Sequence, residues 1–136
     1  MRLKCIRRKR DPADNRVGLE EYRRPDRNEY DLVIGREYIA MGLGFWDGQV
    51  FAEIATEGDF MLSVPLLEFE LVSARPSALW AARIGEDAAF RMWPPSFYAR
   101  DYHSKLADRV PDVVADFERV RAELEDEDHS PLKLER

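Results

Sequence analysis

Few residues in this sequence have the type and spacing to do chemistry. Glu53 and Glu68 fall on expected strands and could form a carboxylate pair for acid–base catalysis, although we expect each to face solvent opposite an apolar strand face. Cys5 would need a nearby histidine or cation to become a nucleophile, and we expect it to be a small buried hydrophobe. His103 could act as a base, but its place on an expected helix favours the surface or the core edge. The sequence therefore shows no active site.

Motifs for cofactors and metals are missing as well. Gly42-Leu43-Gly44 is not followed by a third glycine that opens a helix, so it is not a dinucleotide-binding turn. The chain also lacks a phosphate-binding Gly-Lys-Ser/Thr loop and a His-Glu-x-x-His zinc motif. Its 1 cysteine excludes an internal disulfide and fits a reducing compartment, and its 2 histidines leave little for a metal centre. We expect no cofactor, no metal and no catalysis, with an enzyme as the minor alternative.

Charge is distributed unevenly along the chain. The net charge is −6, but residues 1–36 carry 11 Lys and Arg against 7 Asp and Glu, whereas residues 37–136 carry 10 against 20. The acidic run near the C-terminus is either a solvated helix end or a docking surface for a basic partner, because a field of one sign speeds association. An aromatic residue at the tip of an expected hairpin is a second candidate anchor, or it packs back onto the sheet. The predicted partner-binding residues are Trp46, Asp47, Glu123, Glu125, Asp126, Glu127 and Asp128.

The basic excess lies at the N-terminus, in Arg2, Lys4, Arg7, Arg8, Lys9 and Arg10. Such a run can neutralise phosphates, so nucleic-acid binding by a small barrel is the alternative function. The run is short, contains no interleaved aromatic residue and belongs to an acidic chain. These features favour a solvated strand edge, on which Lys and Arg discourage pairing with other edges.

The first two thirds of the chain have the patterns of β-strands, and these strands would position the candidate residues in that part of the sequence. Residues 2–8 alternate as a first strand, and residues 9–29 form a long, turn-rich loop. Residues 37–45 and 49–56 flank Asp47-Gly48, a strong hairpin signal because both central residues of a type I′ turn have positive φ. A turn at 57–59 leads to extended segments at 60–64 and 66–73, and residues 80–84 and 89–93 predict a second hairpin. This series of short strands predicts a small, strongly curved antiparallel sheet or barrel.

The last third of the chain is helical in pattern. Pro94-Pro95 ends the strands, residues 96–107 have apolar side chains near a helical spacing, and Pro111 is typical of a first helical position. After it, one helix face presents Val113, Phe117, Val120 and Leu124. The predicted class is α+β, with a Src-homology-like curved sheet or barrel followed by two C-terminal helices.

Length and composition predict one globular domain. Hydrophobic residues make up 45% of the chain and charged residues 35%. We expect residues 1–93 to be mainly β, residues 94–128 to be helical and residues 129–136 to form a tail. No apolar run approaches the roughly 20 residues of a membrane span, and no signal-peptide core follows the first residues. We therefore expect a cytoplasmic protein without a membrane partner.

Residues 32–42, with the sequence Leu-Val-Ile-Gly-Arg-Glu-Tyr-Ile-Ala-Met-Gly, resemble a strand of small, mostly uncharacterised bacterial proteins. Members of that family open with a strand ending in Cys-Ile, here Cys5-Ile6, and continue with a Trp-Tyr-Pro-Ala-Glu-Leu-Phe-Glu stretch. The chain keeps Pro65, Phe69, Glu70, Pro76 and Trp80 of the family pattern. It departs from that pattern at Ser63, Val64, Leu67 and Glu68. The resemblance covers roughly residues 1–80 and implies a small β-barrel with appended helices. Some members of the family resemble immunity proteins of bacterial competition systems.

These observations predict a non-catalytic protein-binding module. The resemblance and the acidic charge favour an immunity-type protein that neutralises a cognate toxin by steric and charge-complementary occlusion. Its partner would be another protein with a basic surface. Nucleic-acid binding through the basic N-terminal strand is the alternative.

Overall fold

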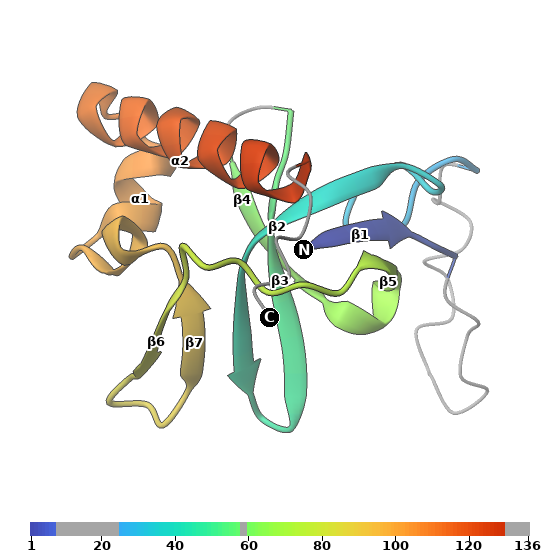
Figure 1. Cartoon of the computed structure of the whole chain (residues 1–136), viewed down its shortest axis with the longest axis horizontal. Helices are drawn as coiled ribbons and strands as arrows, with labels where there is room; N and C mark the ends of the chain where they lie inside the picture. Colours follow the sequence, from blue (N-terminus) through green and yellow to red (C-terminus); the bar gives the residue numbers. More distant parts are fainter. Residues whose placement is uncertain (8–24, 58–59, 130–136) are drawn as a thin grey trace, which may run out of the picture.

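The computed structural model describes residues 1–7, 25–57 and 60–129, which form an α+β fold (Figure 1). Antiparallel strands come first and helices follow, as the sequence predicts. The strands are β1 (Arg2–Cys5), β2 (Glu37–Trp46), β3 (Gln49–Ala55), β4 (Met61–Pro65), β5 (Phe69–Ser73), β6 (Ala81–Ile84) and β7 (Phe90–Trp93). The helices are the 3₁₀ turns η2 (Leu66–Glu68) and η3 (Pro95–Tyr98), and the α-helices α1 (Tyr102–Ala107) and α2 (Pro111–His129).

The long strand β2 organises the whole sheet. Its first half pairs with β1 and its second half with β7, while β3 runs along its other edge. The strand order is β4-β3-β2-β1-β5, and β7 carries β6 as a further strand. The register between β2 and β3 shifts between Ala40 and Gly42, and such a bulge bends and twists a strand. The predicted strongly curved sheet is therefore confirmed, but it is an open, curled sheet and not a closed barrel.

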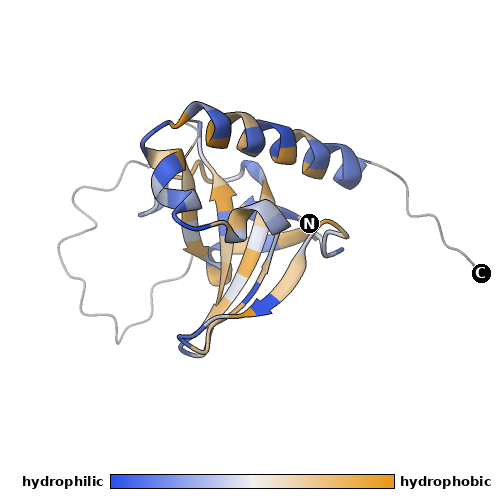
Figure 2. Cartoon of the chain, turned by 90° about the vertical axis from the view of Figure 1, so that its left-hand side faces the viewer, coloured by the Kyte–Doolittle hydropathy of each residue, from blue (hydrophilic) through white to orange (hydrophobic). Residues whose placement is uncertain are grey.

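Helix α2 lies across one side of the curled sheet (Figure 1), and hydrophilic residues cover most of its visible surface (Figure 2). Its buried residues are Phe117, Val120 and Leu124, which belong to the predicted apolar face. They join a core that contains Met41, Ile54 and other strand residues. The helical spacing thus identified the face that packs on the sheet.

The two hairpins form where the sequence predicts them. At the first tip Asp47 has φ 50° and Gly48 has φ 73°, as a type I′ turn requires. The second hairpin joins β6 to β7, with Ala88 in a left-handed conformation at φ 62°. Figure 1 shows the β2–β3 and β6–β7 hairpins projecting from the same end of the molecule.

Several element boundaries differ from the predictions. The first strand ends at Cys5, and the segment predicted to be extended from residue 66 begins with the 3₁₀ turn η2. The helix predicted over residues 96–107 is divided into η3 and α1, because Asp101 takes a left-handed conformation at φ 60° between them. Most of the predicted 9–29 loop, two residues of the 57–59 turn and most of the predicted tail lie outside the described residues. The assignment of the chain to one domain stays a prediction.

Candidate functional site

A cleft of about 530 Å³ lies on one face of the strands β4, β3, β2 and β7. Because side chains alternate along a strand, Ala52 and Ile54 of β3 point into the core, whereas Phe51 and Glu53 point to the cleft. The turn between β6 and β7 and the helix α1 supply the remaining walls. Its polar lining residues are Glu53, Ser63, Asp87, Arg91 and His103. Its aromatic lining residues are Phe45, Trp46, Phe51, Phe90 and Trp93.

Two glycines of β2 shape this cleft: Gly44 lines it, and Gly42 lies against its wall residue Trp93. A Cβ atom on Gly42 would lie 2.6 Å from Cδ1 of Trp93, so the absence of a side chain there lets the indole lie close to the strand. A Cβ atom on Gly44 would meet nothing within 4 Å, because this position opens into the cleft. Gly42 therefore makes room for a wall of the cleft, and Gly44 leaves its floor empty.

Glu53 is the buried charge of the cleft. Its side chain is only 6% exposed, and Ser63 Oγ donates a hydrogen bond of 2.8 Å to Glu53 Oε1. Among the residues that the structure describes, Glu53 has no ion-pair partner within 4.0 Å. A carboxylate that is removed from water without a paired cation is costly, and such groups mark candidate functional sites.

The expectation that Glu53 and Glu68 face solvent is therefore wrong. Glu53 is buried because both faces of β3 are covered, one by the core and the other by the walls of the cleft. Glu68 is 3% exposed in the turn η2, whose main chain bonds to the segment after β1. Glu68 does not line the cleft, so the two carboxylates do not form a pair there.

His103 reaches the cleft from α1 and packs against its aromatic wall. Its ring centroid lies 4.9 Å from that of Trp93. Burial lowers the pKa of His103, the nearby Glu53 carboxylate opposes this shift and the Arg91 guanidinium adds to it. His103 is thus neutral at pH 7, and its half-buried position agrees with the predicted core edge.

Among the described residues that line the cleft, Arg91 provides the positive charge, and a neighbouring carboxylate already pairs with it. Its guanidinium donates to Asp87 Oδ2 at 3.0 Å, and its Cζ lies 5.2 Å from the ring centroid of Trp93. The pairing with Arg91 lowers the pKa of Asp87. The Nε1 atom of Trp93 is buried and has no hydrogen-bond acceptor within the described parts of the chain. The cleft walls thus combine a guanidinium stacked on an indole ring and the carboxylate of Glu53.

The hairpin tip predicted to bind a partner lies at the edge of this cleft. The side chain of Trp46 is 59% exposed and also lines the cleft, and Asp47 is exposed in the turn beside it. The adjacent Phe45 and Phe90 rings have centroids 5.4 Å apart. The structure therefore connects the predicted aromatic anchor with a concave surface, which spacing along the sequence did not reveal.

The predicted acidic docking surface lies elsewhere, on the last turns of α2. None of its residues is among those that line the cleft. Glu123 accepts a bond of 2.8 Å from Arg119, and Glu125 lies 3.4 Å from Arg121. Asp126 also has an interaction partner. These local pairs on one helix neutralise part of the acidic run.

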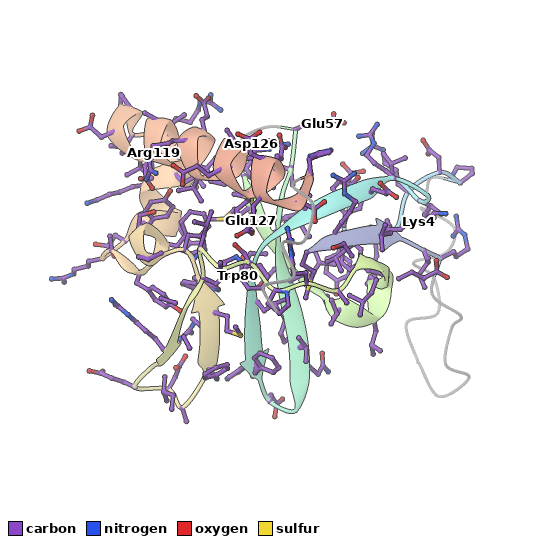
Figure 3. All side chains as sticks on the ribbon, in the orientation of Figure 1. Lys4, Glu57, Trp80, Arg119, Asp126 and Glu127 are labelled. Atoms are coloured by element: carbon purple, nitrogen blue, oxygen red, sulfur yellow. The ribbon has the colours of Figure 1, made fainter. Side chains whose placement is uncertain are left out.

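The end of the acidic run fastens α2 to the sheet. The side chain of Glu127 extends from α2 towards the segment around Trp80 (Figure 3). Its Oε2 accepts a hydrogen bond of 3.0 Å from the Ala78 backbone N–H. Asp128 Oδ2 accepts a bond of 2.8 Å from Arg2 Nε, and the Asp128 side chain is only 5% exposed. Glu127 and Asp128 therefore have structural contacts, whatever their role towards a partner.

The ion pair between Arg2 and Asp128 makes the stability of the fold depend on pH. Burial alone would raise the pKa of Asp128, but the Arg2 hydrogen bond and charge bring it below its ordinary value. The stabilisation is therefore present above about pH 4, the unfolded value, and is lost as the pH falls through the folded pKa. We expect Asp128→Asn to lower the free energy of unfolding at pH 7 by about 1–3 kcal/mol, because one partner of a buried pair is lost.

Urea denaturation at several pH values measures this effect. The difference between Asp128→Asn and wild type should shrink as the pH falls below 4, because both proteins then lack the carboxylate charge. Glu118→Gln, which removes an exposed carboxylate from the same helix, is the control and should stay within about 0.5 kcal/mol of wild type. A difference that stays constant down to pH 2 would contradict the ion-pair explanation.

Part of the basic N-terminal run is also engaged within the chain. Arg2 pairs with Glu37 as well as with Asp128, and Arg7 donates to the Pro25 carbonyl. Lys4 lies on β1, away from the two hairpin tips (Figure 3). Arg8, Lys9 and Arg10 lie outside the described residues.

Cys5, the remaining candidate nucleophile, is a core residue. Cys5 is completely buried, as predicted, and burial followed by the charge of Glu68 raises its pKa, so its thiol is poorly reactive. In the described part of the chain no three His, Cys, Asp or Glu residues come together as a metal site.

None of the described helices is long and apolar enough to cross a membrane. No protein-family model matches the sequence, and neither the curated proteins nor the solved structures contain a significant match.

Proposed function

We propose that this chain is a non-catalytic binding protein that recognises another protein through the cleft between its two hairpins. The observation that carries the proposal is the concave, aromatic surface with Trp46 exposed at its edge. Aromatic side chains are enriched at the energetically dominant positions of protein interfaces, where they fill or border pockets. Trp46 and the cleft floor offer such an anchor and such a pocket side by side.

A protein partner suits this surface better than a small ligand alone. The apolar surface continues past the cleft around the hairpin tips, where Phe45 is 39% exposed and Ile84 is 76% exposed. Both residues are cross-strand neighbours of Phe90, so the three side chains form one patch, which lies on the opposite face of the hairpins from Gly44 and Arg91 and meets the cleft where Phe45 and Phe90 line it. Exposed apolar patches next to a concave site are typical of protein interaction surfaces.

We propose that this binding protein is an immunity-type protein that occludes a toxin. The chain carries a net charge of −6, which would attract a basic toxin domain and speed its capture. The helical acidic residues Glu123, Glu125 and Asp126 would act as steering charges at a distance from the cleft. Their substitution should then lower the association rate and its salt dependence more than it raises the dissociation rate.

A peptide-display selection tests the cleft as the binding surface. We expect peptides selected on the wild-type protein to lose at least about tenfold in affinity on Gly44→Leu, because the new side chain fills the empty floor. The chain offers a matched control in Glu118→Gln, on the solvent side of α2, which should bind the same peptides normally. Selected peptides that bind Gly44→Leu as tightly as wild type would overturn the assignment of this surface.

A further inference from the structure

Closing the cleft with a partner removes Glu53 from the little water that still reaches it. Glu53 is already only 6% exposed, and within the described residues its carboxylate accepts one hydrogen bond, from the neutral hydroxyl of Ser63. A purely apolar guest would bury the carboxylate without compensation, which is strongly unfavourable. A guest that brings a positive charge or several donors would compensate for the lost water.

The charges of the residues that line the cleft also favour a positively charged guest. The described wall residues include the two carboxylates of Glu53 and Asp87 and the single guanidinium of Arg91. Arg91 is engaged by Asp87, and the half-buried His103 ring is neutral at pH 7. Among the lining residues that the structure describes, Glu53 is therefore the carboxylate without a paired cation.

The aromatic walls are suited to a cation as well. Trp46, Phe51 and Trp93 contribute ring surfaces to the cleft, and aromatic faces attract ammonium and guanidinium groups. Arg91 shows that this arrangement works within the chain, since its guanidinium carbon lies 5.2 Å from the Trp93 ring centroid. The empty position above Gly44 leaves room for a second cation from outside.

We infer that the cleft receives a lysine or arginine side chain of the partner protein, with Glu53 as its counter-ion and the aromatic walls around its aliphatic part. This inference rests on the proposed protein-binding function and names the kind of partner, one that presents a basic residue on an exposed segment. Glu53 would provide specificity for charge, while Trp46 and the hairpin tips provide apolar contact.

Blocked tripeptides with a single central residue test the inference. The probes are acetyl-Gly-Arg-Gly-amide and its citrulline counterpart, and acetyl-Gly-Lys-Gly-amide and its acetyl-lysine counterpart. Citrulline has nearly the shape of arginine without its charge, and acetyl-lysine removes the charge of lysine while adding an acetyl group. Binding is followed by NMR chemical-shift titration at low salt. We expect both basic peptides to bind about tenfold more tightly than their neutral counterparts, with the largest shifts around the cleft.

Two variants locate the origin of this preference. Glu53→Gln keeps the size of the side chain and an acceptor for Ser63, and it should abolish the preference for the charged peptides. Glu118→Gln removes the same charge from the exposed side of α2 and should preserve the preference. A preference that survives in Glu53→Gln, or equal binding of charged and neutral peptides, would overturn the inference.

The same set of measurements separates this inference from the proposed function. If display-selected peptides require an open Gly44 position but contain no essential Lys or Arg, the protein-binding function stands and the inference about charge fails. If free choline binds the cleft more tightly than either basic tripeptide, the site takes a small organic cation, and the assignment of a protein partner to the cleft fails.

Discussion

Phe117→Ala is expected to lower the free energy of unfolding by about 3–5 kcal/mol, the usual effect of removing a fully buried aromatic ring. Phe117 has no exposed surface and lies in the middle of α2, where its ring stacks on Phe97 with a centroid distance of 6.3 Å. It therefore connects α2 to η3 and to the core beneath. Because small domains have only about 5–15 kcal/mol of net stability, this loss would be a large share of the total.

Urea denaturation followed by far-ultraviolet circular dichroism measures this loss. Glu118→Ala, at the next position on the exposed side of α2, is the matched control and should change stability by less than about 0.5 kcal/mol. A decrease of less than about 1 kcal/mol for Phe117→Ala would show that α2 contributes little to the core. Binding to the cleft should be unchanged under conditions in which the variant is folded, because Phe117 is not among the cleft residues.

Gly42→Ala should destabilise the protein by about 1–3 kcal/mol, whereas Gly44→Ala should change its stability by less than about 0.5 kcal/mol. The two glycines lie on the same face of the same strand, and the difference comes from their surroundings. A Cβ on Gly42 would lie 2.6 Å from Trp93 Cδ1 and 3.0 Å from the Met92 carbonyl oxygen. The indole cannot move away easily, because it is stacked on Tyr98 with a centroid distance of 5.2 Å.

Denaturation curves of the two alanine variants, measured side by side, test this asymmetry. Tryptophan fluorescence should report a changed environment of the indole in Gly42→Ala and an unchanged one in Gly44→Ala. Equal losses of stability in both variants would show that glycine is needed for backbone conformation and not for the space that Trp93 occupies. Since Gly44 opens into the cleft, its tolerance is also what makes Gly44→Leu a usable blocking variant.

The acidic run illustrates how an interpretation from charge alone changes with tertiary contacts. Along the sequence, Glu123 to Asp128 appears to be a single negative surface. In the folded protein Asp128 is buried against Arg2, and Glu127 accepts a bond from the Ala78 backbone. Both partners are distant in sequence, so no local pattern could identify them. A prediction that treats all five residues as docking charges would confuse a loss of stability with a loss of binding.

Local chemistry was enough to predict many parts of the fold. The tight turn at Asp47-Gly48 follows from the positive φ that its two residues accept, and the helix over residues 111–129 follows from its apolar spacing. The division of the helix predicted over residues 96–107 was not predictable in this way. It depends on Asp101 in a left-handed conformation, which few side chains favour intrinsically.

The amino-acid sequence by itself determined the α+β class, the two hairpins, the buried face of α2 and the position of Trp46 at the first hairpin tip, whereas the exposure of that side chain came from the structure. These features follow from interactions between near neighbours along the chain, such as alternation in strands, the period of a helix and the conformations allowed in turns. Only the tertiary structure decided that Glu53 is buried and that His103, Arg91 and Trp93 surround it. The burial of a strand residue depends on what covers each face of the sheet. Here side chains of β7 and α1 cover the second face, and both elements come far after Glu53 in the chain, so no local pattern could reveal the burial.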